Sequence, residues 1–186
     1  MKKASYIFLA AIAVLFSGCL LKTTSKPLTL YEINYKNNTC VVPNTDKNIY
    51  VESVKALDMV DNRQILITAD RNFIRYLDDA KYVALPSEMF YKMLVKAIYA
   101  NCGAKPSFNS ALNTQRLKVE LISVQILGDK AQISFAYELR DDKKSIKSGY
   151  VNKSVYCPDP SSVTIFNTIN KASNQAIDEL LFEILS

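Results

Sequence analysis

The sequence contains no histidine, and this absence excludes several kinds of active site at once. Without histidine the chain has no Ser-His-Asp triad and no imidazole to activate a catalytic cysteine. Zinc sites that combine cysteine and histidine ligands are excluded as well. Glycine is scarce: Gly18, Gly103, Gly128 and Gly149 are too widely spaced for a loop that cradles phosphate, and there is no Walker motif.

Candidates for acid–base chemistry are therefore limited to carboxylates and lysines. The acid pairs Asp78-Asp79 and Asp141-Asp142 are adjacent in the sequence, and neighbouring residues on a strand or in a turn point apart. We interpret both pairs as solvated carboxylates. Ser-Lys and carboxylate chemistry stay open in principle, but the sequence favours a protein that is not an enzyme and that holds no cofactor or metal.

Charge of one sign is not concentrated anywhere in the chain. The formal net charge is +5, and removal of residues 1–18, which carry Lys2 and Lys3 and no acids, leaves +3. Lysines are otherwise spread singly, apart from the pair Lys143-Lys144. A charge this small, without a basic cluster, argues against nucleic acid as a partner.

The N-terminus carries the strongest signal that is present. Lys2 and Lys3 precede an apolar run of eleven residues, Tyr6 to Phe16, and the small pair Ser17-Gly18 follows. Crossing the hydrocarbon core of a bilayer takes roughly 20 apolar residues, so this run is too short for a membrane-spanning helix. The pattern predicts a signal peptide over residues 1–18.

Cys19 directly follows the predicted signal peptide. The segment Phe16-Ser17-Gly18-Cys19 resembles the bacterial lipobox, with phenylalanine in place of the usual leucine. We expect cleavage before Cys19 and acylation of its thiol, since two or three acyl chains form a stable anchor where one does not. The alternative is a plain secretory signal that happens to precede a cysteine.

The lipidated cysteine and a short tether occupy residues 19–27. The eight residues after Cys19 reach at most about 27 Å, so the folded domain is expected to work close to its membrane. Leu20 does not resemble the aspartate that marks inner-membrane retention in some bacteria. We therefore expect an anchor in the outer membrane and a domain that faces the periplasm.

Three further cysteines, Cys40, Cys102 and Cys157, would enter an oxidising compartment. Three cysteines allow one internal disulfide in three ways, and the pairing stays open. Cys40 and Cys157 both border loops that contain proline, which favours a bridge between those loops. Cys102 closes a predicted helix and would then be a buried free thiol.

The remaining sequence predicts one domain over residues 28–186. Alternating apolar residues predict strands, and apolar residues at helical spacing predict two helices, the second with a long apolar stripe opposite Asn, Lys, Asp and Glu. We predict an α/β fold in which a mixed sheet packs against the two helices. The expected strands are 28–35, 48–57, 64–68, 73–77, 116–127, 131–139 and 146–156, and the expected helices are 86–101 and 163–185.

This layout resembles the ABC-type transport auxiliary lipoproteins, the family of the paraquat-inducible protein C-like lipoproteins. The resemblance covers residues 19–186 and is carried by loose motifs. They are Tyr31-Glu32-Ile33, Val51-Glu52-Ser53-Val54, Val60-Asp61-Asn62-Arg63-Gln64-Ile65-Leu66, Lys81-Tyr82 and Leu85-Pro86. The chain has no tryptophan, so Tyr82 stands where an Arg-Trp step is usual in the family.

The resemblance implies a docking component of an ABC-type phospholipid transport system, with a periplasmic protein of the mammalian-cell-entry type as partner. It places the contact on Arg63, Gln64 and Tyr82, although these residues could equally finish a strand and pack on the core. Two other hypotheses stay open: a periplasmic lipid carrier with its ligand between helices and sheet, and an outer-membrane assembly factor for lipopolysaccharide or barrel proteins. The long C-terminal helix is a further candidate partner surface.

Overall fold

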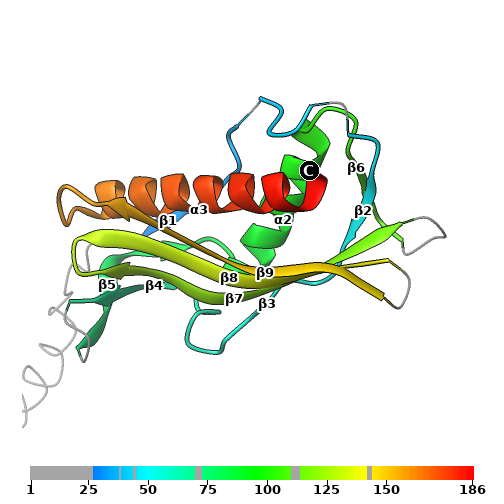
Figure 1. Cartoon of the computed structure of the whole chain (residues 1–186). Helices are drawn as coiled ribbons and strands as arrows, with labels where there is room; N and C mark the ends of the chain where they lie inside the picture. The colour runs from blue at the N-terminus through cyan, green and yellow to red at the C-terminus, as the bar shows by residue number, and fades with distance from the viewer. Residues whose placement is uncertain (1–26, 38, 44, 70–72, 110–113, 142–143) are drawn as a thin grey trace, which may run out of the picture.

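The computed structural model describes residues 27–186 except positions 38, 44, 70–72, 110–113 and 142–143. Within this part of the chain a mixed sheet is packed on one face by two helices, as Figure 1 shows. The predicted fold class, a single α/β domain with a long C-terminal helix, is confirmed. The strands are β1 (Thr29–Tyr31), β2 (Asn48–Val51), β3 (Lys55–Ala56), β4 (Gln64–Thr68), β5 (Ile74–Tyr82), β6 (Lys105–Ser107), β7 (Gln115–Leu127), β8 (Lys130–Asp141) and β9 (Lys144–Tyr156), and the helices are α2 (Pro86–Ala100) and α3 (Ser162–Leu185).

Strand β7 organises the sheet because it is long enough to pair with several short strands. Successive parts of β7 pair in parallel with β2, β3 and β4, and β8 pairs antiparallel with β7 along almost its whole length. Strand β9 then pairs with β8, which confirms the predicted meander of three long strands. The remaining strands extend the sheet on both sides: β5 pairs with β4 and β1 with β5, and β6 pairs with β2.

A bulge in β7 explains a segment that looks apolar on both faces in the sequence. The pairing with β8 shifts between Leu121 and Ser123, so that the side facing the helices changes by one residue there. Leu121 and Val124 are both buried, whereas Ile122 between them is 37% exposed. The bulge therefore keeps Leu121 and Val124 on the core side of β7, while Ile122 lies on the other side.

The core lies between the helices and the sheet. Helix α3 buries Ile169, Ala176 and Ile177 completely, and α2 buries Phe90, whose ring meets Phe135 of β8 edge to face. Pro86 begins α2 as predicted, and Glu88 accepts a hydrogen bond from the backbone N–H of Leu85. No helix in the described ranges is both long and apolar enough to cross a bilayer.

The N-terminal predicted strand, 28–35, is wrong in extent. Only Thr29–Tyr31 pairs as a strand, and the chain that follows lies along α3 instead. The backbone N–H of Asn34 donates to the side chain of Asn170 at 2.8 Å, and the Asn34 carbonyl accepts from Asn174 at 2.9 Å. The side chains of α3 thus replace a neighbouring strand as hydrogen-bond partners.

The same contacts show what a polar row of α3 does. Asn170, Asn174 and Asp178 recur every four residues, among the polar residues that the sequence sets opposite the apolar stripe. This row faces the N-terminal segment: the backbone N–H of Lys36 donates to Asn174, and the hydroxyl of Tyr35 donates to Asp178 at 2.7 Å. Burial and the Asp178 carboxylate raise the pKa of Tyr35.

Two other predicted strands differ in extent, and one observed strand is not predicted. The expected strand 48–57 divides into β2 and β3, because the chain leaves the edge of β7 between them. The expected strand 73–77 continues to Tyr82, where β1 pairs with its end. Strand β6 follows α2 and is not predicted, since three residues with a central proline carry no strand pattern.

We predict that Ile177→Ala lowers the free energy of unfolding by about 2–5 kcal/mol, because it leaves a cavity where α3 meets the sheet. Urea denaturation followed by circular dichroism measures the change. The matched control is Gln175→Ala on the exposed side of the same helix, which we expect to change stability by less than about 0.5 kcal/mol. Equal effects of the two variants would contradict this packing.

Candidate functional site

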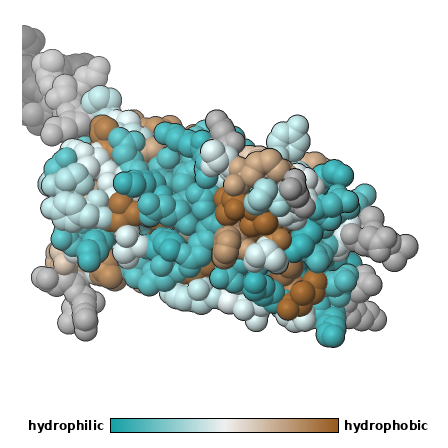
Figure 2. All heavy atoms as spheres, turned by 45° about the horizontal axis from the view of Figure 1, so that its top comes forward, coloured by the Kyte–Doolittle hydropathy of each residue, from teal (hydrophilic) through white to brown (hydrophobic). Residues whose placement is uncertain are grey.

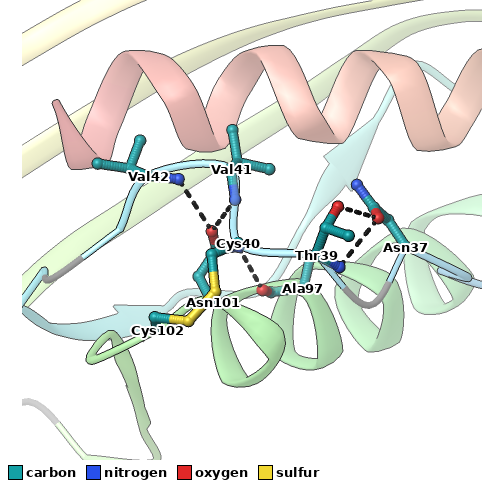
Figure 3. Close-up of a disulfide and its surroundings, with 8 residues drawn as sticks. All are labelled: Asn37, Thr39, Cys40, Val41, Val42, Ala97, Asn101 and Cys102. Carbon is teal, nitrogen blue, oxygen red and sulfur yellow. Dashed lines mark hydrogen bonds between the residues drawn. A yellow bond between two sulfur atoms is a disulfide. The ribbon is translucent and has the colours of Figure 1, made fainter.

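A disulfide between Cys40 and Cys102 closes the C-terminal end of α2 against the N-terminal segment, as Figure 3 shows. Of the three pairings that the sequence leaves open, this one replaces the Cys40–Cys157 bridge that the flanking prolines favour. The Cα atoms of Cys40 and Cys102 are 5.6 Å apart, a usual separation for a disulfide. Cys157 is the buried free thiol, and its backbone N–H donates to Asp129 beside the β7–β8 turn.

Asn101 reinforces the disulfide from the same helix end. Its side-chain oxygen accepts from the backbone N–H groups of Val41 and Val42, at 2.8 and 3.4 Å, and its amide donates to the carbonyl of Ala97. Figure 3 shows these bonds beside the bridge. Because Asn101 is 2% exposed, these bonds satisfy a buried amide and hold residues 41–42 in place.

Gly103 makes a close approach that no other residue could make. Its φ is +90°, and a Cβ at this position would lie 2.0 Å from the carbonyl oxygen of Thr45. The backbone N–H of Thr45 donates to the carbonyl of Cys102 at 3.1 Å. The turn after α2 is therefore fixed to the N-terminal segment by backbone contact as well as by the disulfide.

The fixed turn forms one end of a groove beside α2 with a volume of about 950 Å³. This size is at the upper end of the range for small-molecule sites. The walls are mainly apolar and aromatic, and Tyr99 and Phe108 are 78% and 76% exposed. The lining residues are Asn34, Tyr35, Tyr91, Lys92, Met93, Val95, Lys96, Tyr99, Ala100, Asn101, Cys102, Gly103, Ala104, Lys105, Pro106 and Phe108.

One face of the molecule illustrates the general polarity of the surface. Figure 2 shows a face on which hydrophilic residues predominate and hydrophobic residues gather in separate patches. Tyr99 and Phe108 are the most exposed large hydrophobic side chains among the described residues, and together with the apolar groove they mark a candidate binding site.

Three lysines and no acid line the groove. Lys92 is 2.5 Å from Glu32, and this hydrogen-bonded ion pair lowers the pKa of Glu32. Lys105 is 3.4 Å from Asp46. Among the described residues Lys96 has no carboxylate within salt-bridge distance, so the groove carries one cation whose charge is not balanced nearby.

The residues predicted to contact a partner lie elsewhere, where β4 begins and β5 ends. Arg63 Nε donates to the carbonyl of Tyr82 at 3.0 Å, and the Tyr82 N–H donates to the carbonyl of Arg63 at 2.7 Å. Arg63 is exposed and Gln64 is half-buried, but Tyr82 is only 1% exposed. The structure thus brings Arg63 and Tyr82 together, with the ring of Tyr82 inside the core.

Burial also dominates the chemistry of the Tyr82 hydroxyl. Its oxygen has no hydrogen-bond partner in the described part of the chain, and desolvation raises its pKa. Tyr82 therefore fills a core position. Its neighbour Lys81 pairs with Gln64 across β5 and β4.

The segment Asp61–Gln64 connects the first turn of α2, the start of β4 and the end of β5. The Asp61 carboxylate accepts from both the backbone N–H and the hydroxyl of Ser87 in the first turn of α2, where a negative charge suits the helix dipole. Asn62 accepts from the backbone N–H of Gln64 and sets the turn into β4. Hence Asp61 and Asn62 have structural contacts, and the exposed guanidinium of Arg63 is the part of this motif that is open to a partner.

Cys19, the predicted acylation site, lies outside the described residues. Sequence reasoning missed the groove, although a signal for it exists. Tyr91, Val95 and Tyr99 recur every four residues on α2, beside the stripe that packs on the sheet. This second apolar row had no assigned role in the sequence.

Comparison with solved structures identifies the same fold in two other proteins. A protein of family DUF330 from Xanthomonas campestris has a TM-score of 0.73 at 14% identity, with 84% of this chain and 95% of that chain covered. An uncharacterised protein has a TM-score of 0.72 at 11% identity, with 85% and 99% covered. These identities show a shared fold and no more. No protein-family model and no curated protein matches the chain.

We predict that Cys40→Ala combined with Cys102→Ala lowers the free energy of unfolding by about 2–4 kcal/mol, because a cross-link over 62 residues restricts the unfolded chain. Chemical denaturation measures the loss. Cys157→Ala is the matched control because it keeps the bridge. Alkylation in denaturant without reduction, followed by mass spectrometry, should label Cys157 alone among these three cysteines; label on Cys40 or Cys102 would contradict the assigned pairing.

Proposed function

We propose that this protein is a lipoprotein of the bacterial cell envelope, anchored through Cys19, that serves as a docking component of an ABC-type phospholipid transport system. The proposed partner is a periplasmic protein of the mammalian-cell-entry type. In this role the chain performs no reaction and instead holds a partner near a membrane. A tethered domain is present at high effective concentration beside that membrane, so modest contacts suffice for docking.

The observation that carries the proposal is the N-terminal pattern, in which a charged start, an apolar run and Ser17-Gly18 lead directly to Cys19. The resemblance to auxiliary lipoproteins supports the transport role, and its best-kept motif forms a defined structural unit at Asp61–Gln64. The fold shared with a DUF330 protein is compatible with this proposal and says nothing about its partner.

The surface proposed for docking surrounds the exposed Arg63. The Nε of its guanidinium is held by the Tyr82 carbonyl, which fixes the direction of the side chain while its terminal nitrogens have no hydrogen-bond partner in the described residues. A pre-oriented guanidinium suits a carboxylate on a partner, because it can donate two parallel hydrogen bonds. Gln64 lies next to it and is half-buried.

We expect Cys19→Ala to abolish acylation and to release the protein from the membrane fraction. Metabolic labelling with an alkyne analogue of palmitate, followed by cell fractionation, measures both effects. Cys157→Ala is the control and should leave labelling and fractionation unchanged, since Cys157 is buried. A labelled Cys19→Ala variant would show that the anchor is elsewhere.

We expect Arg63→Glu to reduce capture of a mammalian-cell-entry-type protein by the cross-linked, membrane-anchored chain about tenfold or more, because it replaces an attraction by a repulsion. Quantitative mass spectrometry of the captured proteins measures the change. Lys118→Glu, an exposed substitution on β7, is the matched control with the same change of charge. A circular dichroism melt verifies that Arg63→Glu still folds.

Other outcomes of the same capture experiment support the competing hypotheses. A barrel protein as the main captured partner would indicate an assembly factor. Capture that Arg63→Glu leaves unchanged would move the docking surface away from the Asp61–Gln64 motif.

A further inference from the structure

We infer that the groove beside α2 binds an anionic amphiphile, a molecule with one apolar chain and a negatively charged head. The apolar chain lies along Tyr91, Val95 and Tyr99, and the head lies beside Lys96. A fatty-acid carboxylate and a lysophospholipid phosphate share this chemistry. The inference deepens the proposed function by naming a class of ligand for a lipid-transport component.

The walls of the groove favour an apolar chain because most of their surface is apolar. The buried Asn101 side chain already bonds to Val41, Val42 and Ala97, and the hydroxyl of Tyr35 donates to Asp178. A ligand with many hydrogen-bonding groups would lose its bonds to water without replacing them, which costs free energy for each group. An alkyl chain has no such groups and gains from the burial.

The edge of β6 argues against an extended peptide as the occupant. The N–H of Lys105 donates to the carbonyl of Lys47, so Lys105 faces β2 and the next residue, Pro106, faces the free edge. Proline has no N–H, so this edge offers a carbonyl alone. A peptide that added a strand here would lack a donor at the central position.

The charge of the rim selects the head group. Lys92 and Lys105 are paired with Glu32 and Asp46, whereas Lys96 has no acid partner in the described ranges. Lys92 and Lys96 are one turn apart on α2, and Lys96 lies beside the row that carries Tyr91, Val95 and Tyr99. An ammonium at the mouth of an apolar groove attracts a carboxylate or phosphate. A neutral or cationic head would leave the charge of the ammonium unbalanced.

The groove is also preformed, which lowers the cost of binding. The Cys40–Cys102 bridge, the Asn101 bonds and the close contact between Gly103 and Thr45 hold the end of the groove rigid before any ligand arrives. A mobile wall would have to be ordered at the expense of affinity.

Photo-crosslinking of the full-length lipoprotein in phosphatidylcholine nanodiscs tests the inference. The first probe is a palmitic acid analogue with a diazirine and an alkyne, the second is the matching lysophosphatidylglycerol, and the third is the uncharged methyl ester of the first. After irradiation, mass spectrometry locates the label. We expect both anionic probes, or one of them, to label α2 and residues 104–108 more strongly than the ester does.

Two variants separate the head from the chain. Lys96→Gln should lower labelling by the anionic probes roughly two- to fivefold, the effect of one exposed ion pair, and leave the ester unchanged. Ala100→Trp should fill the groove and reduce labelling by all three probes. Lys171→Gln, an exposed lysine on α3 outside the groove, is the matched control, and equal melting temperatures verify folding.

The two anionic probes distinguish the source of the head, since preference for one identifies carboxylate or phosphate. Label outside the groove, or labelling of the groove that Lys96→Gln does not change, would overturn the inference. A photoreactive amino acid in place of Tyr99 that captures a protein in cells would overturn it in favour of a protein partner. Because nanodiscs contain no transporter, failure here leaves docking through Arg63 untouched, and failure of docking leaves this labelling unchanged.

Discussion

The arrangement depends on the burial of α3 from two sides. Its apolar stripe packs on β7, β8 and β9, and its row of Asn170, Asn174 and Asp178 holds the N-terminal segment through hydrogen bonds. The C-terminal end of the helix is capped as well, since the ammonium of Lys47 donates to the carbonyls of Ile184 and Leu185. A helix held in this way connects the first and the last parts of the domain.

The N-terminal segment links α3 to the groove. Asn34 and Tyr35 are fixed by α3 and line the groove at the same time. The chain then continues to Cys40, where the disulfide attaches it to the end of α2. The groove therefore has walls from two parts of the chain that are distant in sequence, residues 34–35 and 91–108, and the disulfide and the buried Asn101 contacts attach one part to the other.

Local patterns in the sequence predict most of the fold. The alternation in β8 and the helical spacing in α3 are long and regular, so they determine element type and the buried face. Where the structure differs, a contact distant in sequence decides the outcome. The segment 32–35 looks like a strand, but its partner is a row of side chains on a helix, and no pattern within residues 28–35 shows that.

The site is harder to predict because it consists of relations between elements. The spacing of three cysteines does not determine which two form the disulfide. The prolines near Cys40 and Cys157 favour that pair, but the fold places Cys40 at the end of α2, beside Cys102. Tyr82 occupies a place in a family-like motif, yet its ring is buried. The row Tyr91, Val95 and Tyr99 is visible in the sequence. Whether another segment covers this row depends on the path of the chain after the turn at Gly103, which the sequence pattern does not show.

Because one wall contains a disulfide, completion of the groove depends on the redox state of the compartment that holds the chain. As long as the thiols of Cys40 and Cys102 are reduced, residues 40–42 are attached to α2 through the amide of Asn101 without the covalent bond. Oxidation completes that wall. With the export that we propose for this chain, the groove would be completed only after the chain has left the reducing cytosol for an oxidising compartment.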